Sequence, residues 1–489
     1  MSKGGLSDMP VRNLGPKSQE EAPPTAAKNG APAAGERPAE RYKRLPTGTH
    51  GLDPEEVQRD QRERLRTAMV ELIARRGYRA VRILDVTKLA RVSRPTFYTL
   101  YADKEALFLD AYDEISGRAA KAVLDAYEAE GSEGEHLRVA IHAFAALAAD
   151  EPEAMSLFVL GAFGAGAKAL ERRNRTLEAL EQIIRMSRDP ASTERRTDLT
   201  VKVLLGGVRE VTAARLRHGR SSDLPDLVGE LAGWAASYPL KLPAGLEGSS
   251  PPRRRKTDVA PDLTSKRARA AEGRLPSGRH ALSRKFIIKN QRERIVDATA
   301  ATVATKGLGG LTIPEIARRA NVSHQTFYEI YPTKLDAFLG ALKIGMHQAL
   351  RVSGEAFDAH KDDWPRAVSA GLHTLIDYLT SEPAHAHLSL VDTFAASPDA
   401  IEIRDAALQS FSAYLAPGYE LAAKSRPVPP IASEAITGGI WQVLHDYIDT
   451  GRVAELPYVA PQVVYLALFP FLGSRAAAKA ARLRPDALS

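Results

Sequence analysis

The sequence predicts an all-α protein made of two repeated units. Apolar residues recur at three- and four-residue spacings along most of the chain, as on one face of a helix, and strand-like alternation is almost absent. The phrase RLPTGTHGL begins at Arg44 and returns at Arg274 as RLPSGRHAL. The same offset of 230 residues aligns the chain with itself over about sixty residues without a gap, which indicates the duplication of a whole unit.

Composition narrows the class of protein. The chain of 489 residues has no cysteine, which excludes disulfides, Cys-ligated zinc and thiol catalysis. No apolar run marks a signal sequence, and no segment reaches the roughly 18 consecutive apolar residues of a membrane span, so we expect a soluble protein of the cytoplasm. No catalytic constellation, phosphate loop or dinucleotide fingerprint stands out, so we expect neither an enzyme nor a cofactor.

Two stretches have the composition of disordered or linking segments. Residues 1–42 are rich in Pro, Ala, Gly and Glu and have no periodic apolar face. Residues 241–275 carry nine basic and four acidic side chains, as in a solvated tether or a segment that slides along a polyanion. The expected segments are a disordered tail (1–42), a first three-helix domain with an N-terminal arm (43–104), a first helical body (105–240), a basic Pro-rich linker (241–273), a second three-helix domain with its arm (274–334) and a second helical body (335–489).

Each unit opens with three expected helices. In the first unit, apolar residues within 57–76 form one stripe, and Gly77 follows as a stop signal. A short second helix is expected at Ile83–Ala90 and, in the second unit, at Ile313–Ala320. Apolar stripes also predict the later helices of the first body, at residues 137–149, 153–186, 193–218 and 224–240.

The third helix of each unit carries the most informative pattern. It lies within VSRPTFYTLYADK (residues 92–104) and VSHQTFYEIYPTK (residues 322–334). In each copy a serine can cap the helix, and two aromatic residues four apart, Phe97 and Tyr101 in the first copy, would be buried. The tyrosine between them would project outward, and Asp103 would cap the next helix.

These residues resemble the signature of the TetR family of bacterial transcription regulators. Ala90-Arg91-Val92-Ser93, followed by Tyr98, Tyr101 and Lys104, is similar to the family pattern, and Ala320-Asn321-Val322-Ser323, with Tyr328, Tyr331 and Lys334, repeats it. The resemblance is to a tandem fusion of two complete units. It implies, for each unit, a three-helix helix-turn-helix DNA-binding domain followed by a larger helical body that binds a ligand and dimerises.

The two copies depart unequally from the family pattern. The turn glycine is Asn321 in the second unit, which tolerates a left-handed backbone, and Arg91 in the first, which tolerates it less. Thr312 can cap its helix, whereas Arg82 at the matching position cannot. We therefore expect the first DNA-binding domain to be the less ideal one.

The resemblance also implies which side chains meet DNA. Contacts to phosphate would fix the register, and contacts to base edges would read the sequence. Because the outward residues of the two copies differ in chemistry, we expect an asymmetric or pseudo-palindromic operator. The implied phosphate contacts are Thr96, Tyr98, Lys104, Thr326, Tyr328 and Lys334. The implied base contacts are Arg94, Pro95, Thr99, His324, Gln325 and Glu329.

The helical bodies are expected to pair. Residues 193–240 and 431–473 occupy the place of the family's four-helix dimer interface. Both halves would then lie in one chain as a pseudo-dimer; the alternative is a homodimer with four DNA-binding domains. The apolar residues expected to face each other are Leu199, Val203, Leu204, Leu227 and Leu231 in the first unit and Ile436, Ile440, Leu444, Val463 and Leu466 in the second.

A small apolar effector is implied by the resemblance alone. Five aromatic residues of the second body would either line its pocket or form core: Trp364, Phe394, Tyr414, Trp441 and Tyr447. His385 and His387 suggest a metal site, but residues two apart on a helix point to different faces, so we expect none. The glycine-rich stretch at 161–166 follows a helical pattern, not a strand, so it indicates close helix packing rather than a phosphate loop.

The sequence thus favours a sequence-specific transcriptional regulator, expected to be a repressor that binds double-stranded DNA at the bacterial nucleoid and is released by its effector. The rival is an architectural DNA binder that uses both domains and the basic linker without reading sequence. The repeated arm at Arg44 and Arg274 either packs on its own domain or reaches a neighbouring groove.

Overall fold

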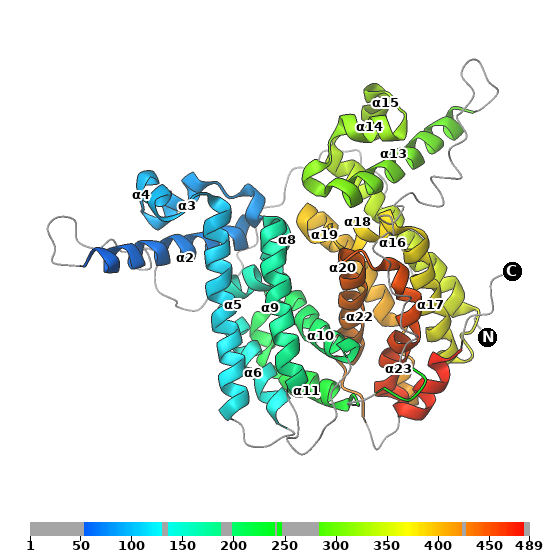
Figure 1. The fold of residues 1–489 in the computed structure, drawn as a ribbon. Helices are drawn as coiled ribbons and strands as arrows, with labels where there is room; N and C mark the ends of the chain where they lie inside the picture. Colours follow the sequence, from blue (N-terminus) through cyan, green and yellow to red (C-terminus); the bar gives the residue numbers. More distant parts are fainter. Residues whose placement is uncertain are drawn as a thin grey trace, which may run out of the picture.

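The computed structural model describes residues 53–129, 135–186, 198–239, 242–246, 283–422 and 427–483. These residues form helices joined by turns, with no strand among them. The expected disordered tail, both N-terminal arms and nearly all of the expected linker lie outside the described residues. Two units lie side by side, with their three-helix domains at the same end of the molecule (Figure 1).

The first unit begins where Asp53 caps a helix by accepting the Glu55 N–H at 3.1 Å. Its DNA-binding domain consists of α2 (Pro54–Ala80), α3 (Ile83–Ala90) and α4 (Arg94–Leu100). Its body consists of α5 (Lys104–Ala129), α6 (His136–Asp150), α7 (Pro152–Ser156), a π-helix (Leu157–Gly161), α8 (Ala162–Ala165), α9 (Ala167–Met186), α10 (Asp198–Arg217), two short 3-10 turns (Ser221–Asp223 and Pro225–Leu227) and α11 (Val228–Ser237).

The second unit begins where Ser283 caps a helix by accepting the Phe286 N–H at 3.2 Å. Its DNA-binding domain consists of α13 (Arg284–Lys306), a 3-10 turn (Leu308–Gly310), α14 (Ile313–Ala320) and α15 (His324–Ile330). Its body consists of α16 (Lys334–Asp358), α17 (Trp364–Ser381), α18 (Pro383–Leu390), α19 (Thr393–Ala396), α20 (Pro398–Ala413), α21 (Gly418–Leu421), α22 (Ala432–Asp449), a 3-10 turn (Val453–Glu455) and α23 (Leu456–Ala481).

Helix boundaries follow the sequence closely, and the differences have local causes. The second helices begin and end at the expected residues. The stretch expected as one helix over 153–186 is broken before α9, where Gly166 adopts a φ of 107° that L side chains rarely adopt. The expected stop at Gly77 is a kink with φ 72°, after which helical backbone continues to Ala80.

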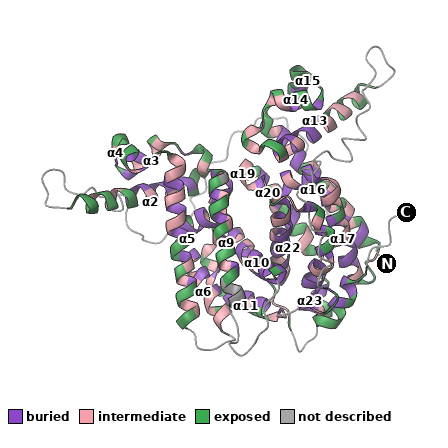
Figure 2. Ribbon diagram, in the orientation of Figure 1, coloured by how far each residue is buried: buried purple, intermediate pink, exposed green. Residues whose placement is uncertain are grey.

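The long helices α5 and α16 join each DNA-binding domain to its body. Helix α5 packs on α2 of the domain and on α6 and α9 of the body, and α16 packs on α13 and on α17, α18 and α20. Their inward faces are buried, as Figure 2 shows by colour. A tilt of either helix would therefore move both a domain and the body beneath it.

The two bodies meet within the chain along α10 and α22. Each helix carries a glycine pair, Gly206-Gly207 and Gly438-Gly439, at matched positions of the repeat. A Cβ on Gly439 would lie 2.4 Å from the carbonyl oxygen of Val203, and a Cβ on Gly207 would lie 2.6 Å from that of Ala435. Because Val203 and Ala435 are themselves matched positions, the two backbones approach with two-fold pseudo-symmetry. We call these four glycines the glycine contact.

The outer glycines obey the same symmetry. A Cβ on Gly206 would lie 2.5 Å from the Gln442 side chain, and a Cβ on Gly438 would lie 2.3 Å from the side chain of Glu210, the residue matched to Gln442. No side chain fits at any of the four positions without movement of its neighbours. The repeated glycines of the sequence are therefore explained by close packing of α10 on α22.

Further contacts extend the junction of the two units. The ten apolar side chains expected there are buried, Leu227 only in part. The Tyr238 hydroxyl donates to the Leu466 carbonyl oxygen at 2.9 Å. Lys202 pairs with Asp446 at 3.3 Å between ammonium and carboxylate. Within this chain the two bodies thus pack against each other through α10 and α22.

One segment, Val453–Ala481, is long and apolar enough to cross a membrane by length and composition. In its most apolar window 67% of the residues are buried within the protein, mainly where α23 packs on α17. Such burial is that of a core helix.

Candidate nucleic-acid interface

Helices α4 and α15 are short surface helices at the outer end of each domain (Figures 1 and 2). Ser93 caps α4 by accepting the Thr96 N–H at 3.1 Å, and Ser323 caps α15 by accepting the Thr326 N–H at 3.0 Å. The predicted serine caps are confirmed. Each threonine hydroxyl also lies within hydrogen-bond distance of its serine hydroxyl, so the first turn of both helices is held by side chains.

The turn before each of these helices is left-handed in both units. Arg91 has φ 53° and Asn321 has φ 49°, and they are the two non-glycine residues with positive φ in the described part of the chain. Left-handed backbone is strained for a residue with a long side chain and better tolerated by Asn. The two turns therefore share one backbone conformation, and the first turn holds it with the residue that tolerates it less.

The start of the second helix differs in the same direction. Thr312 caps α14 through its hydroxyl, which accepts the Glu315 N–H at 3.4 Å, whereas Arg82 makes no such cap to α3. Instead the Asp85 carboxylate accepts the Arg82 backbone N–H at 3.2 Å. The hydrogen bonds from Arg82 lower the pKa of Asp85. An acidic residue in the first turn thus partly replaces the missing cap.

The aromatic residues divide as the sequence predicts. Phe97 and Phe327 are fully buried, while Tyr98 and Tyr328 keep 50% and 57% of their surface exposed. Each outward tyrosine packs edge-on against its buried phenylalanine, which leaves the phenolic hydroxyl at the surface. Each domain thus has one tyrosine hydroxyl at the surface of its outer helix.

The second aromatic of each pair is anchored differently. The Tyr101 hydroxyl donates to the Asp110 carboxylate at 2.5 Å, and burial together with this hydrogen bond raises the pKa of Tyr101. At the position matched to Asp110 the second unit has Gly340, whose added Cβ would lie 2.7 Å from the Tyr331 hydroxyl oxygen. The ring of Tyr331 therefore occupies the space of a side chain that this unit lacks.

Sequence reasoning missed a role for one repeated arginine. Arg64 of α2 donates to the Ala90 carbonyl oxygen at 3.0 Å, and Arg294 of α13 donates to the Asn321 carbonyl oxygen at 2.7 Å. Each guanidinium ties the first helix of its domain to the turn before the outer helix. The available signal was the repeated QRER phrase at 61–64 and 291–294.

The two lysines do not point at open solvent. Lys104 donates to the carbonyl oxygens of Tyr78 and Val81 at 3.0 and 2.9 Å, and its ammonium lies 4.1 Å from the centre of the Tyr78 ring. Lys334 donates to the Leu311 carbonyl oxygen at 2.9 Å. Partial burial lowers the pKa of Lys104. Both ammonium groups thus hydrogen-bond backbone oxygens in the segment where the first helix ends and the second begins, and their implied contacts to phosphate stay a prediction.

The residues expected to read bases are all exposed on α4 and α15, namely Arg94, Pro95, Thr99, His324, Gln325 and Glu329. Some already have internal partners. Gln325 donates to the Glu329 carboxylate at 3.1 Å, and Thr99 donates to the Pro95 carbonyl oxygen at 3.1 Å. Arg94 and His324 are the remaining polar side chains of this set, and both are exposed at the start of their helices.

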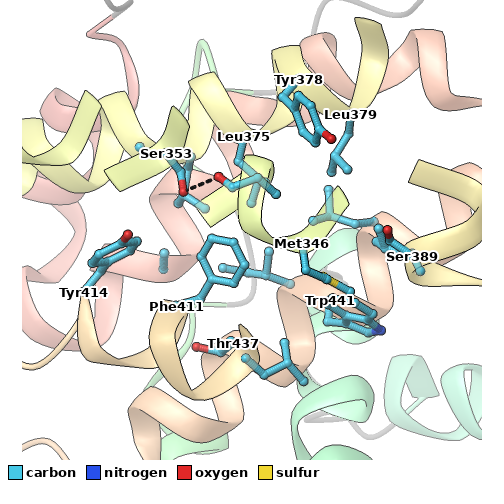
Figure 3. A pocket seen from close by; sticks show the side chains of 18 of the residues that line it. Met346, Ser353, Leu375, Tyr378, Leu379, Ser389, Phe411, Tyr414, Thr437 and Trp441 are labelled. Carbon is cyan, nitrogen blue, oxygen red and sulfur yellow. Dashed lines mark hydrogen bonds between the residues drawn. The ribbon is translucent and has the colours of Figure 1, made fainter. Parts of the chain in front are cut away.

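The second body contains an apolar cavity of about 860 Å³ between α16, α17, α18, α20 and α22. Figure 3 shows Tyr414 and Trp441 at its wall, as expected. Three of the five expected residues lie elsewhere: Trp364 donates to the Tyr414 carbonyl oxygen at 2.8 Å and packs on Phe471, Tyr447 lies under Arg452, and Phe394 faces the junction of the units. None of these three side chains lines this cavity, and each makes contacts of its own.

Two polar atoms in this cavity have no hydrogen-bond partner among the described residues. They are the Oγ of Ser389 and the Nδ1 of His385, on buried side chains of α18. The other ring nitrogen of His385 lies 3.1 Å from the carboxylate of Asp297, on α13 of the DNA-binding domain. The neighbouring His387 instead pairs with Asp392 at 2.9 Å, so the two histidines do point to different partners as predicted.

The first body holds an apolar cavity of about 740 Å³ that the sequence analysis missed. Its wall uses matched positions of the repeat: Val123, Tyr127 and Phe158 correspond to Ser353, Phe357 and Ser389 of the second cavity. The repeat alignment could have located this cavity, because it pairs the lining residues of one body with those of the other. Its wall is less polar where the second has serines, but it includes the guanidinium-bearing Arg209.

A known protein family matches both three-helix domains. The model of the family described as bacterial regulatory proteins, tetR family, matches residues 65–111 and 295–340. No curated protein matches the chain.

Three solved structures resemble part of the chain. The fatty acid degradation regulator FadR from Bacillus halodurans is 17% identical, with 36% of this chain and 94% of that one covered and a TM-score of 0.33. FadR from Bacillus subtilis in complex with stearoyl-CoA is 18% identical, with 36% and 97% covered and a TM-score of 0.32. A TetR-like transcriptional regulator from Rhodococcus sp. RHA1 is 21% identical, with 37% and 96% covered and a TM-score of 0.30.

The family match falls at the same place in each half of the repeat and covers the helices described above. The chain therefore carries two domains of the family described as bacterial regulatory proteins, tetR family, one in each of its two units.

Proposed function

We propose that the protein is a cytoplasmic repressor that sits on the nucleoid and reads an asymmetric or pseudo-palindromic operator with two unlike domains of one chain. The observation that carries the proposal is the pair of capped, exposed helices α4 and α15 at one end of a molecule whose bodies are joined by the glycine contact. Two such helices reach successive major grooves when they lie roughly 34–36 Å apart.

In this proposal the outward tyrosines and the capping threonines bind phosphates. Tyr98 and Tyr328 offer exposed hydroxyls, and Thr96 and Thr326 lie in the first helical turn, where free N–H groups also favour an anion. Lys104 and Lys334 act differently from the expectation: they hold the start of α5 or α16 against the first helix of the domain. They position the reading helices rather than supply the main phosphate contacts.

Base reading falls to the exposed side chains at the start and outer face of each helix. Arg94 can fork onto guanine, and Gln325 can pair with adenine once it gives up its internal bond to Glu329. Pro95, Thr99 and His324 complete the two sets. Because no residue type is shared between the two sets, the two half-sites should differ in sequence.

The proposed effector is a small apolar molecule with one hydrogen-bonding group, bound in the cavity of the second body. The wall is almost wholly apolar, and the unpartnered Ser389 and His385 atoms would meet the polar group. His385 also contacts Asp297 of the DNA-binding domain, so a ligand that pulls on this ring would disturb the seat of α13. The FadR structure from Bacillus subtilis was solved with stearoyl-CoA, which supports testing acyl compounds first.

Footprinting of the purified chain on DNA flanking its own gene tests the proposal. The expected result is protection of two adjacent major-groove segments of different sequence. A strict palindrome protected by a single chain would contradict the asymmetric reading. A steep salt dependence with equal affinity for all sequences would favour the architectural alternative instead.

A further inference from the structure

A third cavity, of about 370 Å³, lies at the junction of the two units. Helices α8, α9 and α10 of the first unit form one wall, and α19, α20 and α22 of the second form the other, elements that lie side by side in Figure 1. The Phe163 ring of one unit stacks on the Phe394 ring of the other with centres 4.5 Å apart. The cavity is thus built from both halves of the repeat and belongs to neither body alone.

Three buried arginines line this cavity. Arg173, Arg209 and Arg404 expose 2%, 8% and 1% of their surface. Two of them are fixed by aromatic rings: the Arg173 guanidinium lies 4.5 Å from the Phe163 ring centre, and the Arg404 guanidinium lies 4.5 Å from that of Phe394. Positive charge is therefore concentrated on buried side chains around one cavity.

Only one of the three has its charge neutralised at the cavity. Arg404 binds the Glu210 carboxylate through two hydrogen bonds of 2.9 and 2.5 Å, and Arg217 pairs with Glu210 at 2.9 Å and with Asp405 at 3.0 Å. Two cations thus balance two carboxylates. These guanidinium groups hold the pKa of Glu210 at about 2, despite its burial.

Arg173 and Arg209 have neutral partners only. Both donate to the same amide oxygen of Gln442, at 3.3 and 3.0 Å, and Arg209 also donates to the Val159 carbonyl oxygen at 3.2 Å. Within the described part of the chain no carboxylate lies at ion-pair distance from either guanidinium, and Asp449 acts on Arg173 only from further away. Burial lowers the pKa of Arg173 to about 9, which still leaves it charged at neutral pH. Neither of these two positive charges is in direct contact with a carboxylate of the described residues.

Several polar atoms around the cavity also have no hydrogen-bond partner within the described structure. They are the Nε atoms of Arg173 and Arg404, the indole nitrogen of Trp441 and the Nε2 of His445. Buried donors without acceptors destabilise a fold, as do buried cations without anions. The same arrangement is what a bound anion with several acceptor oxygens requires.

We propose that this cavity binds one small oxyanion, a carboxylate or a phosphate, between Arg173 and Arg209. Oxygen atoms of the anion would accept from both guanidinium groups, and the Trp441 indole would supply a further donor. The cavity is smaller than either apolar cavity, so the occupant is a compact ion rather than their effector. Since residues of both units would hold it, the anion would stabilise their junction.

Thermal unfolding and titration calorimetry of the full chain test this site. Sodium phosphate and sodium acetate are compared with sodium chloride at equal ionic strength and pH 7. The expected result is a higher melting temperature with at least one of the oxyanions and binding of one ion per chain. A response to phosphate alone, or to acetate alone, identifies the source of the oxyanion. Equal melting temperatures in all three salts would overturn the proposal.

Two variants place the response at this cavity. In Arg173→Gln the affinity for the oxyanion should fall about tenfold or more, because one charge-assisted contact is lost. In Gln442→Glu an internal carboxylate would replace the anion, so the protein should be more stable in chloride and should no longer respond. The control is Arg351→Gln, which removes the same charge from an exposed pair with Glu355 and should respond as the wild type does.

The second variant keeps the test decisive if the first does not fold. An oxyanion response that survives in Gln442→Glu at full strength would place binding elsewhere and contradict the proposal. A response lost in Arg351→Gln as well would show a general charge effect and contradict it equally.

Discussion

The two units share one plan but differ in where polar groups are buried. In the second unit, His385 faces the cavity and contacts Asp297 of the DNA-binding domain. In the first unit the matched residues are Ala154 and Thr67, so this contact is absent. The first unit instead places Arg209 and Glu210 at the junction. The second unit thus links its cavity wall to its three-helix domain through a polar contact that the first unit lacks.

The DNA-binding domains differ in the same sense. The second has Asn321 in its left-handed turn and Thr312 as a helix cap, whereas the first has Arg91 and Arg82. Yet α3 and α14 begin and end at matched residues, and an arginine of the first helix ties down each turn. Tertiary contacts therefore hold both domains in the same geometry, although the turn and cap residues of the first domain favour it less. Four mutational tests show how far this comparison extends.

The largest expected loss of stability comes from giving the two sides of the junction the same residue at one matched position. Glu210→Gln gives Glu210 the identity of its matched residue, Gln442. The pKa of Glu210 falls from 4.5 to about 2 on folding. The ionised carboxylate therefore stabilises the folded protein fully above pH 4.5, and this stabilisation is lost as the pH falls toward 2. The variant should lose about 3 kcal/mol of unfolding free energy at pH 7. Chemical denaturation at several pH values measures this; an equal acid dependence in variant and wild type would contradict it.

Breaking the glycine contact should have the next largest effect. In Gly439→Ala the new methyl group would lie 2.4 Å from the Val203 carbonyl oxygen, so α10 and α22 must separate. We expect a loss of about 2 kcal/mol of unfolding free energy. Gly117→Ala in α5 is the control, because nothing lies within 4 Å of the added group and helix propensity improves. Equal stability of the two variants would show that the contact is not tight.

The division of roles on α15 can be separated by two changes. Tyr328→Phe removes an exposed hydroxyl and should weaken binding to every DNA sequence by about 1 kcal/mol. Gln325→Ala should change the preference at one base pair by about 1–3 kcal/mol. Fluorescence anisotropy with single-base variants of the operator distinguishes them. If both changes acted uniformly, the assignment of Gln325 to base reading would be wrong.

The smallest expected effect concerns the turns. Arg91→Gly relieves a left-handed backbone under a long side chain and should stabilise the first domain by about 1 kcal/mol. Asn321→Gly should gain less, since Asn already tolerates this conformation. Hydrogen exchange of amides in α3 and α14 reports the two domains separately. A greater gain in the second unit would reverse the comparison.

Much of this architecture was readable because the chain is repeated. The caps at Ser93 and Ser323 and the buried phenylalanines follow from local spacing, and apolar stripes marked the last helices of each unit as those that meet. Spacing could not reveal that Lys104 turns back onto carbonyl oxygens, because its partners lie 23 and 26 residues away.

Cavities posed a different problem. Aromatic residues were expected to line the effector site, yet Trp364 and Tyr447 fill contacts of their own. The walls of both apolar cavities consist mainly of aliphatic residues that look like ordinary core in a sequence. The junction cavity depends on arginines that lie far apart in the chain, such as Arg173 and Arg404, so only the fold brings them together.

The central claim is that one chain carries both reading domains of one functional pair. Light scattering of the protein bound to a short operator duplex tests it most directly. The account predicts a complex whose protein mass is that of a single 53.0 kDa chain, with both domains engaged. A complex that forms only with two chains on the duplex, each using one domain, would contradict it.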